Sequence, residues 1–310
     1  MNEMSAIGPS RAFKSALGAG LLLASLAIAV GSLPADSKPK APADPRPTQP
    51  AVVFQLLDAQ SSPAVFSRAN STRDALGFPT GVRRTGRRVK DSFQQAEFDE
   101  VDELDAKGDL VSLTQFEPSG RLRVAVRLDQ SPHPATRVDG ESASQAAQRG
   151  VAAAGLLVGG PRHVDSDVAT DGWTVRWERT QNGVSVRGDE TRVQVRPDGS
   201  IQSLARIEHQ LAAEPTRRLD SDQAKRLVTN QAHQWFEASG SSYTIQKMDV
   251  EWVAPNDTFG SGQSADPQQA YRLAWVANVK PSGPAADYAW LVTVYIDAGD
   301  GSLLGGDIVE

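Results

Sequence analysis

The sequence contains no cysteine, so the chain can form neither a disulfide bond nor a thiolate metal site. It has only four histidines, and none of them belongs to the His-Glu-x-x-His helix that holds zinc in metallopeptidases. A Gly-x-Ser-x-Gly nucleophile elbow and a Gly-x-x-x-x-Gly-Lys phosphate loop are also missing. We therefore expect a protein that is not an enzyme and that needs no cofactor.

Basic side chains do not outnumber acidic ones either. Lysine and arginine number 32 against 38 aspartates and glutamates, and the net charge of -6 argues against a nucleic-acid partner. Basic residues cluster in residues 82–90, and acidic residues follow in 97–105. We interpret these stretches as a solvated loop beside an acidic face, with opposite charges that pair weakly. The alternatives are a basic patch for a wall polymer or anionic lipid, and a protease-sensitive loop.

One long apolar run is present, from Ala16 to Leu33, and it follows the basic residues Arg11 and Lys14. This order is typical of a secretory signal or a signal anchor. At about 18 residues the run is at the lower limit for crossing a bilayer, so cleavage and anchoring both stay open. We expect a secreted or extracytoplasmic protein, tethered to the membrane by residues 16–33 if they are not removed. Residues 1–35 form this signal, and residues 36–97 a Pro-rich spacer and a poorly defined segment.

From about residue 98 the pattern becomes regular. Apolar residues at helical spacing predict helices over 139–154, capped by Asp139 or Ser142, and over 220–236, with Asp220 and Gln223 as a capping box. Asn182-Gly183 predicts a tight hairpin, because both residues tolerate positive φ. Alternating patterns predict strands over 109–116, 120–129, 173–179, 184–186, 191–196, near Ile201, 271–279 and 288–296.

These pieces occur twice along the chain. Each copy has a helix, a strand rich in tryptophan, and a later strand that ends in an Asp-Gly turn before Ile201 or Leu303. The repetition predicts an α+β fold with two tandem units, each a helix packed on a small antiparallel sheet. We place the first unit at residues 98–212 and the second at 213–310.

The hairpin residues Glu178-Arg179-Thr180-Gln181-Asn182-Gly183-Val184-Ser185-Val186 resemble the propeptide motif of fungalysin- and thermolysin-type metallopeptidases. The C-terminal segment, with Leu273-Ala274-Trp275 and Val294-Tyr295-Ile296-Asp297-Ala298-Gly299-Asp300-Gly301, is similar to the PepSY domain of those precursors. Asp300 stands where that family usually has threonine. The resemblance covers about residues 135–310. It implies a module that covers the active-site cleft of a peptidase, inhibits it and assists its folding.

Together the residues and the resemblance predict a non-catalytic exported binding module. Its expected partner is a secreted metallopeptidase or another envelope protein, with the membrane added if the N-terminal run is uncleaved. A structural or regulatory envelope protein, which binds another exported protein or a wall component, is the alternative. A remnant of a truncated peptidase precursor is a further one.

No catalytic, cofactor-binding or metal-binding residue can be assigned. We expect the four histidines to be structural or exposed: His133, His163, His209 and His233. Three C-terminal carboxylates lack the spacing of a calcium loop and are expected in ordinary turns: Asp297, Asp300 and Asp307. Four tryptophans at period-2 spacing are expected in the core: Trp173, Trp177, Trp252 and Trp275. Trp290 lies on the other strand parity from Tyr295, and an exposed Trp290 would be a candidate for partner contact.

Overall fold

The computed structural model describes residues 53–56, 63–91, 96–129, 137–167, 171–236, 240–263 and 269–309. All of them belong to one compact unit, Pro50–Glu310. The apolar run 16–33, the Pro-rich stretch 34–50 and His133 lie outside the described residues. In the part of the chain that is described, no helix has the length and apolar character needed to cross a bilayer.

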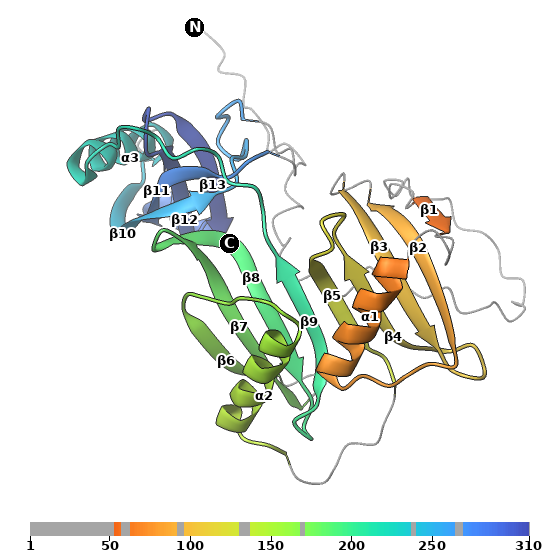
Figure 1. Ribbon diagram of the computed structural model, residues 1–310. Coiled ribbons are helices and arrows are strands. Elements are labelled where there is room, and N and C mark those ends of the chain that lie inside the picture. The colour runs from red at the N-terminus through yellow and green to blue at the C-terminus, as the bar shows by residue number, and fades with distance from the viewer. Residues whose placement is uncertain are drawn as a thin grey trace, which may run out of the picture. The chain divides into compact units, whose positions relative to one another are not determined.

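A helix followed by four antiparallel strands recurs three times along the described chain (Figure 1). The first segment contains α1 (Pro63–Leu76), β2 (Arg83–Asp91), β3 (Ala96–Leu104), β4 (Leu110–Phe116) and β5 (Leu122–Arg127). The second contains α2 (Gly140–Ala153), β6 (Arg162–Asp167), β7 (Gly172–Gln181), β8 (Val184–Val195) and β9 (Ile201–Ile207). The third contains α3 (Ser221–Phe236), β10 (Ser242–Val253), β11 (Arg272–Ser282), the short 3-10 helix η2 (Gly283–Asp287), β12 (Leu291–Asp297) and β13 (Leu303–Val309). A short strand, β1 (Val53–Leu56), precedes them and pairs with β2.

The prediction of two tandem units, each with its own small sheet, is wrong. The 13 strands form one hydrogen-bonded sheet with the order β1-β2-β3-β4-β5-β9-β8-β10-β11-β12-β13, and β7 and β6 branch from β8. β5 pairs with β9 across the first segment border, and β8 meets β10 in parallel at Val186 and Trp252 across the second. The sheet is therefore mixed. The sequence patterns predicted two strands of its first segment, now β4 and β5, but did not reveal α1, β2 and β3. The domain boundaries at residues 98 and 213 stay predictions.

The two predicted helices are confirmed as α2 and α3. They could be predicted because a short capping motif marks the start of each one. Asp139 caps α2 by accepting a hydrogen bond from the backbone N–H of Ser142 at 2.7 Å. At α3, the Asp220 carboxylate accepts from the N–H of Gln223 at 2.7 Å, and the Gln223 side chain accepts from the N–H of Asp220 at 3.0 Å. This reciprocal pair is a capping box, and it satisfies two backbone donors that the helix itself leaves unbonded.

Replacing Asp220 with alanine is expected to lower the free energy of unfolding by about 1 kcal/mol, the usual loss for an N-cap acceptor. Urea unfolding of the purified chain measures the change. Asp222→Ala is the control, because Asp222 lies in the first turn of α3 but does not cap it. A loss from Asp222→Ala as large as that from Asp220→Ala would contradict the assignment of the cap.

The Asn182-Gly183 hairpin is confirmed as well, with φ angles of 52° and 78° at its two turn residues. The two strands predicted after it, 184–186 and 191–196, are instead one continuous strand, β8. Gly188 lies between the two stretches with φ of 81°, a conformation that residues with a side chain adopt only at a cost.

The interpretation of residues 82–105 as a solvated loop beside an acidic face is wrong. The basic stretch is β2 and the acidic stretch is β3, and the two strands pair over their full length. Arg84 reaches Glu103 at 2.7 Å and Arg88 reaches Asp99 at 2.8 Å. Four of the five acidic side chains of β3 are buried, so the arginines neutralise charges inside the fold: Asp99, Glu100, Asp102 and Glu103.

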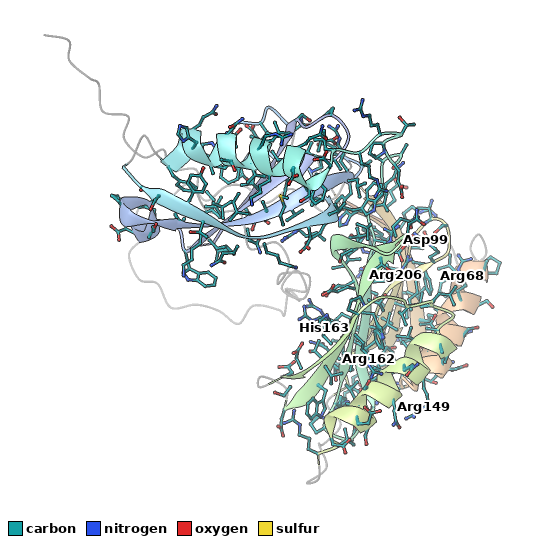
Figure 2. All side chains as sticks on the ribbon, turned by 90° about the vertical axis from the view of Figure 1, so that its left-hand side faces the viewer. Arg68, Asp99, Arg149, Arg162, His163 and Arg206 are labelled. Carbon is teal, nitrogen blue, oxygen red and sulfur yellow. The ribbon has the colours of Figure 1, made fainter. Side chains whose placement is uncertain are left out.

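The apolar core lies between the helices and the strands. α1 and α2 share one cluster of buried side chains with strands of the first two segments, and α3 covers β10, β11 and β12 with a second cluster (Figure 2). The predicted core position of four tryptophans is confirmed: Trp177 and Trp252 are buried, and Trp173 and Trp275 pack partly buried against these clusters. Trp252 lies in a smaller cluster with Val186, where β8 meets β10.

Candidate partner-binding site

An apolar pocket of about 340 Å³ lies in the third segment, at the C-terminal end of α3. The capped helix brings Trp235 and Phe236 onto the strands, where the Trp235 ring lies 4.2 Å from the ring of Phe259 between centroids. The rest of the wall comes from η2, the turn after it and the last two strands: Pro284, Ala285, Tyr288, Ala289, Val292 and Ile308. An apolar cavity of this kind is the usual form of a binding site for an apolar group.

Large apolar side chains are exposed in the segments that contribute residues to this pocket. Tyr288 is 79% exposed and Trp290 is 63% exposed, and Val309 at the end of β13 is 44% exposed. Trp290 is therefore exposed, which is the condition under which the sequence made it a candidate for partner contact. Exposed aromatic residues that gather around an apolar pocket are typical of an interaction site, whereas single exposed apolar residues are not.

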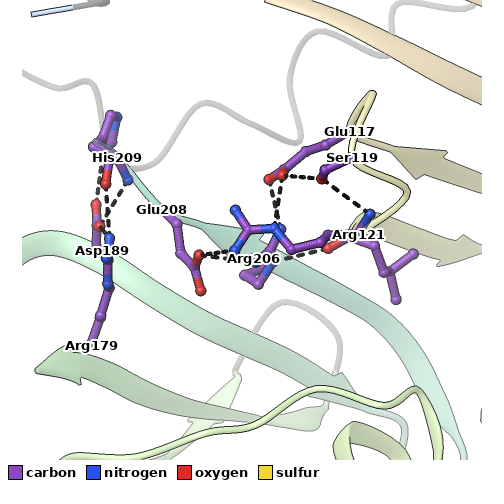
Figure 3. Close-up of polar contacts among 9 residues, drawn as sticks. Glu117, Ser119, Arg121, Arg179, Asp189, Arg206, Glu208 and His209 are labelled. Carbon is purple, nitrogen blue, oxygen red and sulfur yellow. Dashed lines mark hydrogen bonds and ion pairs between the residues drawn. The ribbon is translucent and has the colours of Figure 1, made fainter. Parts of the chain in front are cut away.

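A second cluster is polar and centres on Asp189, whose side chain is completely buried (Figure 3). Its carboxylate accepts hydrogen bonds from Arg179 at 2.8 Å and from the backbone N–H of His209 at 2.9 Å. It also contacts Nδ1 of His209 at 2.5 Å, and the His209 ring stacks on Tyr271 at 4.5 Å. Burial and the nearby Asp189 carboxylate raise the pKa of Tyr271 well above its ordinary value.

An aspartate bonded to a histidine, as in the Asp189–His209 pair, is also part of hydrolytic triads. A triad needs a nucleophile hydrogen-bonded to the other ring nitrogen. Within the described residues, no serine or threonine hydroxyl bonds to His209. The cluster joins Arg179 of β7, Asp189 of β8 and His209 after β9 to Tyr271, the residue before β11.

A further polar cluster surrounds Arg206 on β9, whose side chain is only 5% exposed (Figures 2 and 3). Its Nε donates to the carbonyl oxygen of Leu122 at 3.0 Å, and its two Nη atoms reach Glu117 at 2.6 Å and Glu208 at 3.0 Å. Arg121 binds the same two carboxylates from the surface, at 3.0 Å each. Sequence reasoning missed this cluster, because nothing in the pattern distinguishes Arg206 from an exposed strand arginine.

The remaining predicted residues do not come together. Nε2 of His163 lies 2.9 Å from Glu178 on the neighbouring strand, and His233 is exposed on α3. Asp297 and Asp300 both contact Arg272, at 2.8 and 3.3 Å. Asp307 bonds to the hydroxyl of Tyr295 on β12 and lies 3.7 Å from Arg187. Among the described residues, no group of three or more potential ligands is close enough to hold a metal ion.

No protein-family model matches the chain, and no curated protein matches it in sequence. Among solved structures, it is similar to the YpeB C-terminal domain of Bacillus megaterium. The similarity covers 83% of this chain and 99% of that chain, with a TM-score of 0.43 and 10% sequence identity. At this TM-score and identity, the similarity supports no conclusion about the fold or the role of this chain.

Proposed function

We propose that the protein is an exported, non-catalytic binding module that holds part of another exported protein against the apolar pocket of its third segment. The observation that carries the proposal is the exposed Tyr288, which lines an apolar pocket of about 340 Å³, together with the exposed Trp290 two residues further along the chain. Export is supported by the apolar run Ala16–Leu33.

The identity of the partner is the finer part of the proposal. The propeptide-like motifs at Asn182-Gly183 and at residues 294–301 favour a secreted metallopeptidase, which the module would inhibit or assist in folding. A binding module with an apolar pocket suits this role, since burying the tyrosine and tryptophan against a partner supplies affinity without any chemical step. An envelope protein without peptidase activity is the alternative partner.

The double substitution Tyr288→Ala with Trp290→Ala is expected to weaken partner binding at least tenfold, because exposed aromatic anchors each contribute about 2 kcal/mol in such interfaces. The measurement is capture of exported proteins of the source cell on the immobilised full chain, followed by titration of the captured protein. Leu157→Ala is the control, because Leu157 is 100% exposed in the loop after α2 and lines no part of the pocket.

The result decides between the partners as well. A captured zinc peptidase that the chain slows would support the metallopeptidase partner, whereas a captured protein without peptidase activity would support the envelope alternative. Capture that is equal for the wild type and the double variant would contradict the pocket as the binding site. Absence of any captured protein would contradict the binding function.

A further inference from the structure

The outer edge of β13 is partly open beside the pocket. β13 is the last strand of the sheet and pairs only with β12 among the described strands. Along its far side, the Leu304 carbonyl accepts from the N–H of Asn256 at 2.8 Å, and the Gly306 N–H donates to the Asn256 side chain at 3.0 Å. Asn256 thus takes the place of a neighbouring strand over residues 304–306, and no other described residue is hydrogen-bonded to this side of β13.

The backbone of Ile308 continues this open edge. Backbone groups of a strand point alternately to its two sides. The carbonyl of Val309 faces β12, where it accepts from the N–H of Trp290 at 2.7 Å, whereas Gly306 faces away. Ile308 shares the parity of Gly306, so its N–H and C=O also point away from β12. Neither group has a partner among the described residues.

The side chain of Ile308 connects this edge to the pocket. Ile308 lies directly opposite Val292 on β12, and both side chains line the pocket. Residues that face each other on adjacent strands present their side chains on the same face of the sheet. A residue that paired with Ile308 from outside would therefore direct its side chain to the face that carries the pocket.

The charges near the pocket indicate which side chains a bound segment would carry. Apart from the end of α3, which contributes Trp235 and Phe236, the pocket is lined by stretches 254–263, 283–292 and 303–309, which contain three aspartates but neither lysine nor arginine. Asp307 is held by Tyr295, whereas Asp257 and Asp287 are exposed and form no ion pair with a described side chain. Asp287 precedes Tyr288 and Asp257 lies two residues before Phe259, and exposed carboxylates so close in sequence to pocket residues favour basic residues on either side of an apolar one.

We infer that the partner binds by strand addition. An extended segment pairs with the edge of β13 at Ile308, places one aliphatic or aromatic side chain in the pocket, and directs lysine or arginine two residues away toward Asp257 and Asp287. Main-chain hydrogen bonds supply affinity in this mode, and the pocket supplies specificity. The inference rests on the proposed function, because it describes how the same pocket receives its partner.

Synthetic heptapeptides of the form Thr-Lys-Thr-X-Thr-Lys-Thr, with X as leucine, isoleucine or phenylalanine, test the inference by fluorescence polarisation on the full chain. At least one is expected to bind. Methylating the amide nitrogen of X removes the donor to the Ile308 carbonyl and is expected to weaken binding about tenfold, which equals about 1.4 kcal/mol. Methylating the next amide, which points away from β13, is the control and is expected to change binding less than about twofold. Exchanging both lysines for glutamate is expected to weaken binding about tenfold at low salt.

Substitutions in the chain provide the second measurement. Ile308→Pro removes the outward N–H, and an edge strand tolerates proline at such a position. Ile308→Ala is the matched control, since it shortens the side chain but keeps the N–H. Binding by Ile308→Pro is expected to be about tenfold weaker than binding by Ile308→Ala, with melting temperatures of the two variants compared to verify folding.

Several outcomes would overturn strand addition. They are no binding by any of the peptides, equal effects of the two methylations, or glutamate peptides that bind as well as lysine peptides. A dimer of the chain that Ile308→Pro dissociates would overturn it as well, because a second copy would then be the occupant. If the captured protein is lost by Tyr288→Ala with Trp290→Ala but not by Ile308→Pro, the proposed function stands and strand addition is wrong.

Discussion

Replacing Arg206 with alanine is expected to lower the free energy of unfolding by about 3 kcal/mol. The ladder between β5 and β9 is short, running from the pair Val124–Ala205 to the pair Val126–Ser203. Arg206 is the next residue of β9 after this ladder. Its side chain is 5% exposed and joins Leu122, Glu117 and Glu208. Removing one partner from a buried ion pair costs about 3–5 kcal/mol, and we take the lower value because the two carboxylates are partly exposed.

Arg121→Ala is the matched control for this prediction. Arg121 contacts the same two glutamates at 3.0 Å, but its side chain is 55% exposed. An exposed ion pair contributes about 0–1 kcal/mol, so this variant is expected to remain close to the wild type. Urea unfolding followed by tryptophan fluorescence measures both. Equal losses from the two variants would show that the burial of Arg206 is not what stabilises the junction between β5 and β9.

The elements that could be predicted from the sequence are those whose ends carry a local signal. The cap at Asp139, the capping box at Asp220 and the Asn182-Gly183 turn each act over two to four residues, so their motifs are readable without knowledge of the fold. α1 carries no such signal. Its first turn contains no acidic residue. Its buried residues form only a weak apolar stripe: Val65, Ala69, Thr72 and Leu76.

The order of the strands could not be predicted, because it depends on pairs that are distant in sequence. β2 contains four arginines and looks like a solvated loop until β3 supplies buried carboxylates 11 to 19 residues away. The pocket is a similar case. Trp290 could be singled out from its strand parity, but the pocket walls come from stretches between Trp235 and Ile308 that only tertiary packing brings together.

Asp102 is the least well satisfied carboxylate of the β3 ladder. Its Oδ1 is buried without a hydrogen-bond partner, and its Oδ2 lies 3.4 Å from Arg87, a residue that also serves Glu100. Burial, and then repulsion from Glu100, raise the pKa of Asp102 from 3.8 to about 6 against the opposing effect of Arg87. The folded state therefore binds this proton more tightly than the unfolded state, and the ionised form of Asp102 destabilises the fold.

Asp102→Asn is expected to raise the free energy of unfolding by about 2 kcal/mol at pH 8. A shift of about two pKa units, in which the attraction to Arg87 is already included, corresponds to nearly 3 kcal/mol, and we take a lower value because the asparagine amide only approximates the protonated carboxyl group. Because the pKa of Asp102 is raised in the folded state, the gain in the free energy of unfolding of Asp102→Asn over the wild type should be largest above the folded pKa of about 6. It should then shrink as the pH falls toward 4, where Asp102 of the wild type becomes protonated in both states.

Urea unfolding of the two proteins from pH 4 to 8 measures the difference, in which the titration of all other groups cancels. Asp99→Asn is the control on the same strand, because Asp99 is paired with Arg88 at 2.8 Å and its neutralisation should destabilise the fold. A stabilising effect of Asp102→Asn that does not change with pH would contradict the raised pKa. A destabilising effect at pH 8 would show instead that the contact of Asp102 with Arg87 outweighs the cost of burying its charge.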